Sequence, residues 1–233
     1  MGYLLWSYAS NSVPWGIQRP TIYLLSILTM KKLFVNILLC LVPLFLILAL
    51  YICFDPFKVI FSYENYYISD AHNSTGVDLD KDYTSTQNLI NNLSKYNYDS
   101  FIFGSSRSMY YSADEWGNYI HSQNTYHFDA FGESILGIYR RVMFLNKQNV
   151  KIKHALFVLD YATLKIMDEN NFHSPMHPIL SGHSWMWFEL EHFKKFLNAE
   201  FFWAYFDFKL NHKIRSYMRK DGLLGDSKIR YNK

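Results

Sequence analysis

The chain has 233 residues, enough for one good-sized domain plus an anchor but too few for two full domains. Its 23 basic and 20 acidic residues give a formal net charge of +3, and no run of Lys or Arg exceeds two residues, so no basic stripe indicates a nucleic-acid partner. Aromatic residues make up 19% of the chain, which argues against disorder and favours a packed protein with some lipid contact.

Residues 1–29 form an N-terminal extension without clear periodicity. Met30 is followed at once by Lys31 and Lys32, a natural start for an exported protein. We therefore expect translation to begin at Met30 and residues 1–29 to be upstream sequence, which mass spectrometry of the intact N-terminus tests.

An apolar stretch of 21 residues without a charge runs from Leu33 to Cys53. At about 1.5 Å per residue it matches a bilayer core about 30 Å thick. A cleaved signal peptide is the rival interpretation, but the stretch is longer than a usual signal core and no small-x-small cleavage site follows it. We therefore expect an uncleaved signal-anchor over residues 30–54. The lysines before it predict a cytoplasmic N-terminus, a single-pass protein of the cell membrane, and an extracytoplasmic bulk of the chain.

Beyond the anchor, residues 55–85 are rich in Tyr, Asn, Asp and Ser and predict a membrane-proximal connector with little regular structure. Residues 86–233 then form the candidate domain. Both cysteines, Cys40 and Cys53, lie in or at the end of the apolar stretch. The exported part therefore offers neither a disulfide framework nor a cysteine-based metal site.

Short apolar segments and helical stripes alternate through the exported part. Predicted strands lie at residues 100–104, 124–128 and 154–160, and predicted helices at residues 86–97, 113–122 and 132–148. The first and third strands are almost continuously apolar, as in strands buried on both faces of a parallel sheet. The alternation predicts a doubly wound α/β sheet.

The helix predicted at residues 132–148 has one apolar stripe, and Arg140, Arg141 and Lys147 lie off that stripe. The stripe consists of Ile135, Ile138, Tyr139, Val142 and Leu145.

After the third strand the pattern changes. Residues 171–185 carry His173, His177 and His183 between Pro and Gly residues; their spacing gives no helical pair, so we expect no metal site. Residues 186–220 predict one or two aromatic-rich helices, which could be core, a lid over the site, or a membrane-interface segment. Their charges are mixed in sign, which favours core or lid. Because three strands are few for this class, either these helices complete the core or the chain lacks its remaining strands.

Each predicted strand ends in polar residues, at Gly104–Ser108, Asp129–Ser134 and Asp160–Tyr161. In an open α/β sheet, ligands bind beyond the carboxyl ends of the strands. A serine in this position can act as a nucleophile if a base reaches it and N–H donors face the developing oxyanion.

The blocks FIFGSSRS, HFDAFGES and LFVLDY resemble the opening half of the SGNH/GDSL hydrolase superfamily, over roughly residues 50–220. More narrowly, the chain is similar to membrane-anchored bacterial SGNH-like proteins that serve cell-surface polysaccharide acylation or deacylation. The resemblance implies a flavodoxin-like parallel sheet and no cofactor. It also implies that Ser106 is the nucleophile and that the backbone N–H of Gly132 helps to form the oxyanion hole.

Two features depart from the family pattern. Many members carry an asparagine in the third block, where this chain has Asp160, a carboxylate that would repel an oxyanion and is better suited to orient a neighbour. The family's Asp-x-x-His, which supplies the base, is absent from the sequence. Three explanations fit this absence: another histidine supplies the base, the protein is an inactive homologue, or the chain is truncated. We favour truncation. Asp207 and His212 form only a weak candidate pair.

Each candidate residue has a structural alternative. Ser106 fits an ordinary strand-ending turn, and Gly132 fits a turn that needs backbone freedom. Arg107, grouped with Ser105 as substrate-binding, fits anion or sugar recognition or an ion pair with Asp129 or Asp160; we favour the pair. We expect His127 and His154 to be capping or surface groups.

From these observations we expect a membrane-anchored SGNH-like esterase or acyltransferase that acts on acyl esters of a cell-surface glycan. It would work beside a surface polysaccharide and membrane acyltransferase machinery. The alternative is a catalytically inactive envelope protein with a binding or scaffolding role.

Overall fold

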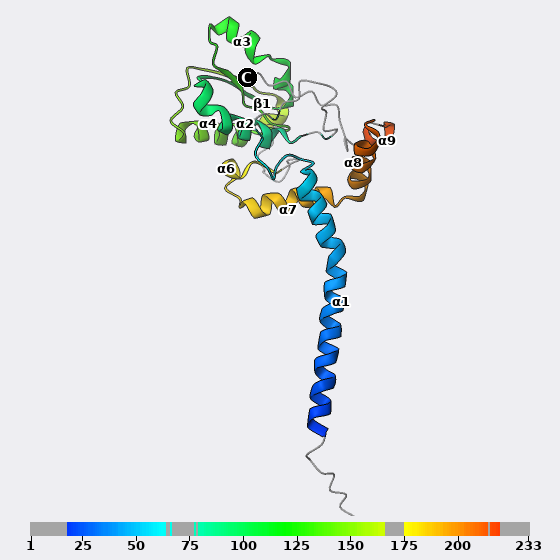
Figure 1. Ribbon diagram of the computed structural model, residues 1–233. Coiled ribbons are helices and arrows are strands. Elements are labelled where there is room, and N and C mark those ends of the chain that lie inside the picture. Colours follow the sequence, from blue (N-terminus) through cyan, green and yellow to red (C-terminus); the bar gives the residue numbers. More distant parts are fainter. Residues whose placement is uncertain are drawn as a thin grey trace, which may run out of the picture. The chain divides into compact units, whose positions relative to one another are not determined.

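The computed structural model describes residues 18–63, 66, 77, 79–165, 175–213 and 215–219, with the side chains of residues 18–29 and 219 excepted. The chain divides into two units, Met1–Leu50 and Tyr51–Lys233. The elements, drawn in Figure 1, are α1 (Gln18–Phe54), α2 (Lys81–Tyr96), β1 (Ser100–Gly104), the 3₁₀ helix η2 (Ser106–Tyr110), α3 (Ala113–Ile120), β2 (Thr125–His127), α4 (Ile135–Lys147), β3 (His154–Val158), α5 (Tyr161–Lys165), α6 (Pro178–Ser181), α7 (Trp185–Phe196), α8 (Ala199–Asn211) and α9 (Ser216–Arg219).

The helix α1 contains the predicted apolar stretch. Within the described part of the chain, it is the one helix long and apolar enough to cross a membrane, over Met30–Phe54. Its side chains from Met30 to Leu46 are exposed. These properties fit a single-pass anchor or an export signal.

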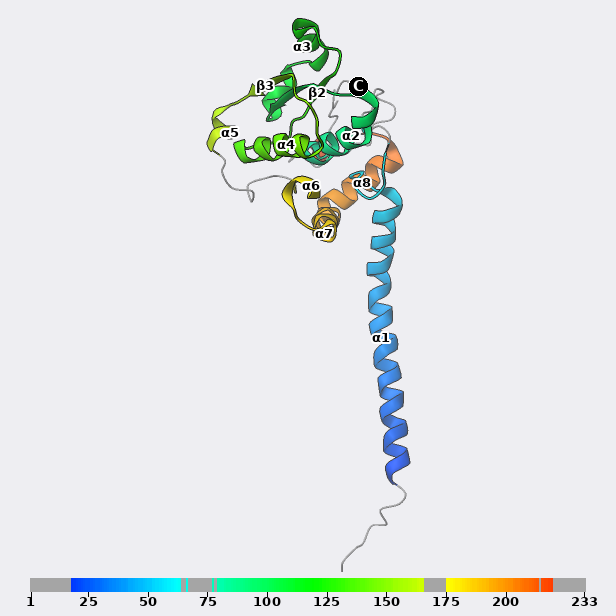
Figure 2. The ribbon, with the colours of Figure 1, turned by 90° about the vertical axis from the view of Figure 1, so that its left-hand side faces the viewer.

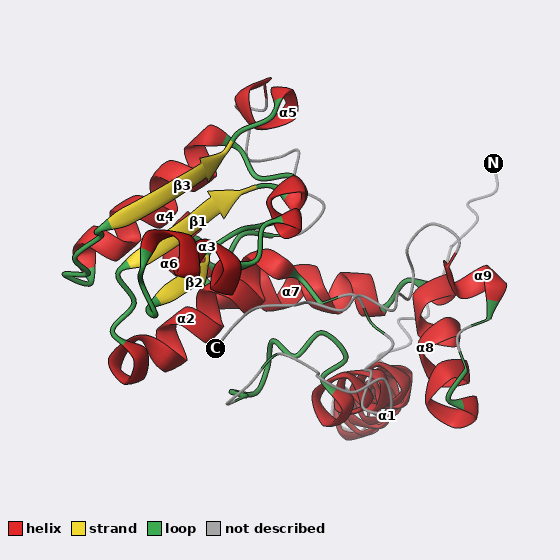
Figure 3. Ribbon diagram, turned by 90° about the horizontal axis from the view of Figure 1, so that it is seen from above, coloured by secondary structure: helices red, strands yellow, loops and turns green. Residues whose placement is uncertain are grey.

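The sheet confirms the predicted α/β fold. Three strands lie in the order β2-β1-β3, and both pairings are parallel, with Phe101 beside Tyr126 and Ala155. Figure 3 shows the arrows of the three strands running in one direction, with α5 following the end of β3. Their carboxyl ends therefore share one edge of the sheet.

Helices cover both faces of this sheet. Figure 2 shows α2 and α4 on one face and α3 on the other. The core between the sheet and the first pair is aromatic and aliphatic, and it includes Leu89, Phe101, Phe103, Phe128 and Leu145. Ile102, the residue of β1 that points to the opposite face, is also fully buried. The central strand is thus buried on both faces, as predicted.

The third strand is more exposed than predicted. In β3 the side chains alternate between exposed and partly buried, and Phe157 is 47% exposed although its ring stacks on Phe103. The apolar composition indicated burial on both faces, but β3 is an edge strand of the described sheet that its neighbours cover only in part, whereas the other edge strand, β2, is buried.

Helix α4 corrects a second prediction. Its buried residues are Gly137, Ile138, Arg141, Phe144 and Leu145, whereas Ile135 and Tyr139 are exposed. Arg141 was predicted to lie off the apolar stripe but is fully buried. Its Nε donates to Glu133 Oε2 at 2.6 Å, and its Nη2 lies 3.1 Å from Asp82 Oδ2. Ion pairing therefore replaces solvent around this guanidinium.

Helix α2 begins at Lys81, five residues earlier than predicted, so residues 81–85 are helical and do not belong to an irregular connector. Asp80 caps the helix by accepting from the backbone N–H of Asp82. The predicted aromatic helices are present as α7 and α8, which bury Phe188, Phe196 and Tyr205.

Candidate active site

The turn after β1 holds the predicted nucleophile. Gly104 has no room for a side chain, because an added Cβ would lie 2.8 Å from the Ser108 Cβ and from the Val158 carbonyl oxygen. Ser105 follows in an extended conformation, and η2 starts at Ser106. The tight packing at this glycine fixes the point where residues 105–108, the serine turn, leave the sheet.

Ser106 is exposed, and among the described residues its hydroxyl has no hydrogen-bond partner. Gly132 lies in the loop after β2 with φ of 61°, in the left-handed region that favours glycine, and an added Cβ there would meet open space. This loop runs beside the serine turn, because the backbone N–H of Ala130 donates to the Gly104 carbonyl at 3.3 Å. The sequence predicts that Ser106 attacks the substrate and that the Gly132 N–H helps to bind the resulting oxyanion. This joint role stays a prediction.

The structure brings Ser105, Arg107 and Asp160 together at the carboxyl edge. The Ser105 hydroxyl donates to Asp160 Oδ2 at 3.0 Å. Arg107 Nε lies 3.2 Å from the same oxygen, and 71% of the arginine side chain is exposed. The predicted ion pair between Arg107 and a carboxylate is confirmed, with Asp160 as the partner.

Asp160 also anchors the start of α5. Its Oδ1 accepts from the backbone N–H of Thr163 at 2.7 Å and from the Thr163 hydroxyl at 3.0 Å. The Thr163 N–H, followed by the hydroxyls of Thr163 and Ser105 and by the Arg107 charge, lowers the pKa of Asp160 below its ordinary value, although desolvation opposes this. An ionised Asp160 orients its neighbours and does not donate to an oxyanion.

A buried cluster beneath the turn was not predicted as a unit. Ser108, three residues after Ser105, donates its hydroxyl proton to the Ser105 carbonyl at 2.7 Å. His127 Nε2 lies 2.9 Å from the Ser108 oxygen, and Lys81 Nζ lies 2.8 Å from Asp129 Oδ2. All four side chains are buried.

The Ser108 hydroxyl is the centre of this cluster. The single Ser108 proton has two further acceptors nearby, Asp129 Oδ2 at 3.4 Å and, in one tautomer, His127 Nε2 at 2.9 Å. The tautomer of His127 therefore decides which group donates across the contact between Ser108 and His127. Burial lowers the pKa of His127, against the opposing charge of Asp129, and so favours the neutral imidazole. His127 was expected at the surface or in a cap, and this expectation was wrong. It lies inside β2 and holds the serine turn from below.

The other described histidines differ in burial. His177 is buried, its Nδ1 accepts from the backbone N–H of Ile179, and its Nε2 contacts Gln87 Oε1 at 3.1 Å. His154 and His183 are exposed, and His173 falls outside the described residues. In the described part of the chain no three His, Cys, Asp or Glu residues are grouped to hold a metal ion.

Comparisons with known proteins add no relative. No protein-family model, no curated protein and no solved structure matches this chain. What the fold defines is an α/β protein with a three-stranded parallel sheet and a serine turn at its carboxyl edge.

Proposed function

We propose that the protein is a membrane-anchored, extracytoplasmic SGNH-like esterase or acyltransferase that acts on acyl esters of a cell-surface glycan through Ser106. The observation that carries the proposal is the exposed Ser106 between Ser105 and Arg107, which both contact Asp160 from the neighbouring strand. In a sheet of order 2-1-3 the crevice between strands 1 and 3 is where doubly wound proteins bind ligands. Ser106 follows strand β1, which lies beside β3 in this sheet.

The proposed chemistry is attack of the Ser106 oxygen on the acyl carbonyl carbon. The backbone N–H groups of Ser106 and Gly132 would hold the oxyanion of the tetrahedral intermediate. The sugar oxygen then leaves with the proton that the serine hydroxyl lost, and water or a second sugar hydroxyl takes the acyl group from the serine. A base must carry that proton, and no described histidine contacts the Ser106 hydroxyl.

The missing contact favours the second candidate, a catalytically inactive envelope protein with a binding role. Loss of a triad histidine typically lowers turnover by several orders of magnitude. An inactive protein would still present Arg107 and the exposed serine turn to a ligand.

The anchor part of the proposal rests on the apolar stretch Met30–Phe54. Lys31 and Lys32 at its start favour a cytoplasmic N-terminus by the positive-inside rule, which would leave the α/β unit outside the membrane.

Labelling with a fluorophosphonate probe tests the nucleophile in the full chain in membranes. We expect labelling of the wild type and loss of labelling in Ser106→Ala, with Ser216→Ala as the matched variant of an exposed serine in α9. Equal labelling of the wild type and Ser106→Ala would rule out Ser106, and absence of labelling in both would favour the inactive protein.

A further inference from the structure

Helix α7 carries two apolar stripes. The first, Phe188, His192 and Phe196 at intervals of four residues, is buried against the rest of the unit. The second lies about 130° away around the helix and consists of Met186, Leu190, Phe193 and Leu197. Met186 is 82% exposed, and Leu190 and Leu197 are also exposed. A helix at a protein surface normally presents polar side chains opposite its buried stripe, whereas here Met186, Leu190 and Leu197 are apolar and exposed.

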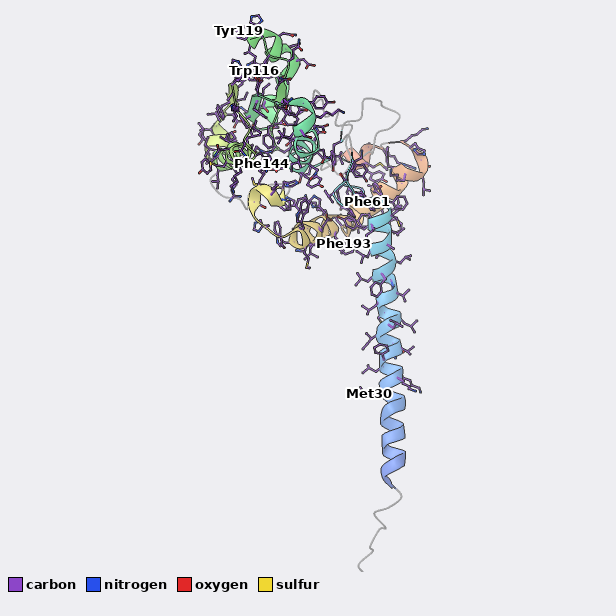
Figure 4. The ribbon with its side chains drawn as sticks, turned by 60° about the vertical axis from the view of Figure 1, so that its left-hand side comes forward. Met30, Phe61, Trp116, Tyr119, Phe144 and Phe193 are labelled. Atoms are coloured by element: carbon purple, nitrogen blue, oxygen red, sulfur yellow. The ribbon has the colours of Figure 1, made fainter. Side chains whose placement is uncertain are left out.

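The second stripe is continuous with the end of the apolar stretch in α1. Figure 4 shows Phe193 on α7, and its ring lies 5.3 Å from the ring of Tyr51. The Tyr51 hydroxyl also donates to Glu189 Oε2 at 3.3 Å. Tyr51 comes three residues before Phe54, where the apolar helix ends, which is about 4.5 Å along a helix axis. Tyr51 thus belongs to the last turn of the candidate span Met30–Phe54 and itself contacts α7.

From these contacts we propose that α7 lies in the membrane interface, with Met186, Leu190 and Leu197 among the outer acyl chains. The proposal rests on the anchor part of the proposed function but not on its chemistry. Interfacial helices bury their apolar face about 5–10 Å into the boundary between headgroups and acyl chains. Trp185 and Trp187 in the first turn are both partly exposed, and tryptophan is enriched at this depth.

The charges of α7, whose mixed signs favoured core or lid in the sequence, leave apolar burial as the driving force of the proposed contact. Glu189, Glu191, Lys194 and Lys195 balance one another, and Lys194 Nζ pairs with Glu191 Oε1 at 2.6 Å. The helix thus lacks the excess of lysine and arginine that attracts anionic lipids. Apolar burial holds it at the interface, and exchange of neutral for anionic lipid leaves its depth unchanged.

Spin-label accessibility in the full chain tests this depth. Single cysteines replace Met186, Leu190, Tyr119 and Leu39 in turn, in a Cys40→Ser, Cys53→Ser background, and each protein is labelled with a nitroxide in phosphatidylcholine nanodiscs. Tyr119 is the control, because it is 83% exposed and lies on α3, away from α7 (Figure 4). Leu39 reports on the apolar helix itself.

We expect labels at positions 186 and 190 to collide mainly with oxygen and several-fold less with an aqueous nickel complex than the label at 119. The same ratio is expected when phosphatidylglycerol replaces part of the phosphatidylcholine. Nickel access at 186 equal to that at 119, with the label at 39 in lipid, would overturn the interface while leaving the anchor intact. Shielding of the label at 186 from both oxygen and nickel would indicate that a protein partner covers the stripe. That result would also overturn the proposed membrane contact. Nickel access at both 39 and 186 would refute the anchor together with the interface.

Discussion

Asp160 is the residue through which the loops at the carboxyl edge are joined. One of its carboxylate oxygens contacts Ser105 and Arg107, and the other contacts Thr163. Hydrogen bonds to a charged group contribute about 1.5–3 kcal/mol each, about twice the contribution of neutral ones. The serine turn and the start of α5 are therefore held by a single ionised side chain.

We expect Asp160→Asn to lower the free energy of unfolding by about 1–2 kcal/mol, because the amide retains the shape but not the charge. The pKa of Asp160 is lower in the folded state than in the unfolded state. The stabilisation is thus complete above pH of about 4 and is lost as pH falls through the folded value. Urea unfolding in detergent at neutral and acidic pH measures both effects. Asp114→Asn, on the exposed first turn of α3, serves as control and should change stability by less than about 0.5 kcal/mol.

Among individual residues, the sequence predicted the contacts that follow from the order of the parallel strands. Ser105, Arg107 and Asp160 follow parallel strands, so their meeting at one edge was foreseeable. Ser108 and His127 were missed, although a signal existed, since His127 and Asp129 are two apart along a strand direction and so share a face. The burial of Arg141 had no local signal, because its carboxylate partners Asp82 and Glu133 lie outside its own helix.

At the scale of elements, Arg141 joins α4 to α2. Its guanidinium contacts Glu133, Asp82 and the hydroxyls of Ser85 and Thr86. Its carbon Cζ also lies 4.6 Å from the centre of the Phe128 ring. The two helices on this face of the sheet thus share a buried charge as well as an apolar core.

We expect Arg141→Met to destabilise the folded state by about 3–5 kcal/mol, because two buried carboxylates lose their counter-charge. Glu133→Gln should cost less, since the amide still accepts from the guanidinium. Thermal unfolding followed by circular dichroism provides the comparison. A loss for Arg141→Met no larger than that for the exposed Arg107→Met would show that solvent reaches this cluster.

Strand β3 illustrates why the burial of a strand cannot be read from its composition. Its apolar sequence resembles that of β1, yet β1 is central and β3 lies at the edge of the described sheet. Strand order is set by the packing of the whole unit, which no local window contains. Exposed apolar edge strands favour pairing with other chains.

We therefore expect the purified protein to self-associate through β3, and Phe157→Lys to reduce this association by placing a charge on the edge strand. Light scattering at increasing protein concentration in detergent detects the change. Tyr119→Lys, at a more exposed aromatic site on α3, is the control for the added charge. If both variants associate as the wild type does, β3 is not the contact.

At the scale of the whole molecule, the exported unit buries titratable groups in its aromatic layer. Burial and the Arg141 charge lower the pKa of His177 to about 3, and burial and Lys195 lower that of His192 to about 3. His177 stacks on Tyr83 and contacts the ring of Trp185. Glu189 behaves in the opposite way, since burial raises its pKa to about 7.

These groups give the protein a defined acid sensitivity. Between pH of about 6.5 and 3 the unfolded chain protonates His177 and His192 while the folded chain does not, so stability falls as pH falls. Each histidine accounts for up to about 1.4 kcal/mol per pH unit in this window. Glu189 opposes the trend, because between about pH 4.3 and 7 the folded state holds its proton more tightly than the unfolded state.

We expect His177→Gln to flatten the fall of the unfolding midpoint between pH 6 and 4.5, and Glu189→Gln to steepen it. The glutamine at 177 retains an acceptor for the Ile179 N–H but does not titrate. Thermal unfolding of the detergent-solubilised chain, scanned in half-unit steps of pH, separates the two slopes. His183→Gln is the control, because that imidazole is exposed and its removal should leave the slope unchanged. A His177→Gln slope identical to that of the wild type would mean that the buried imidazole is protonated in the folded state, and the aromatic layer around it would then have to admit water.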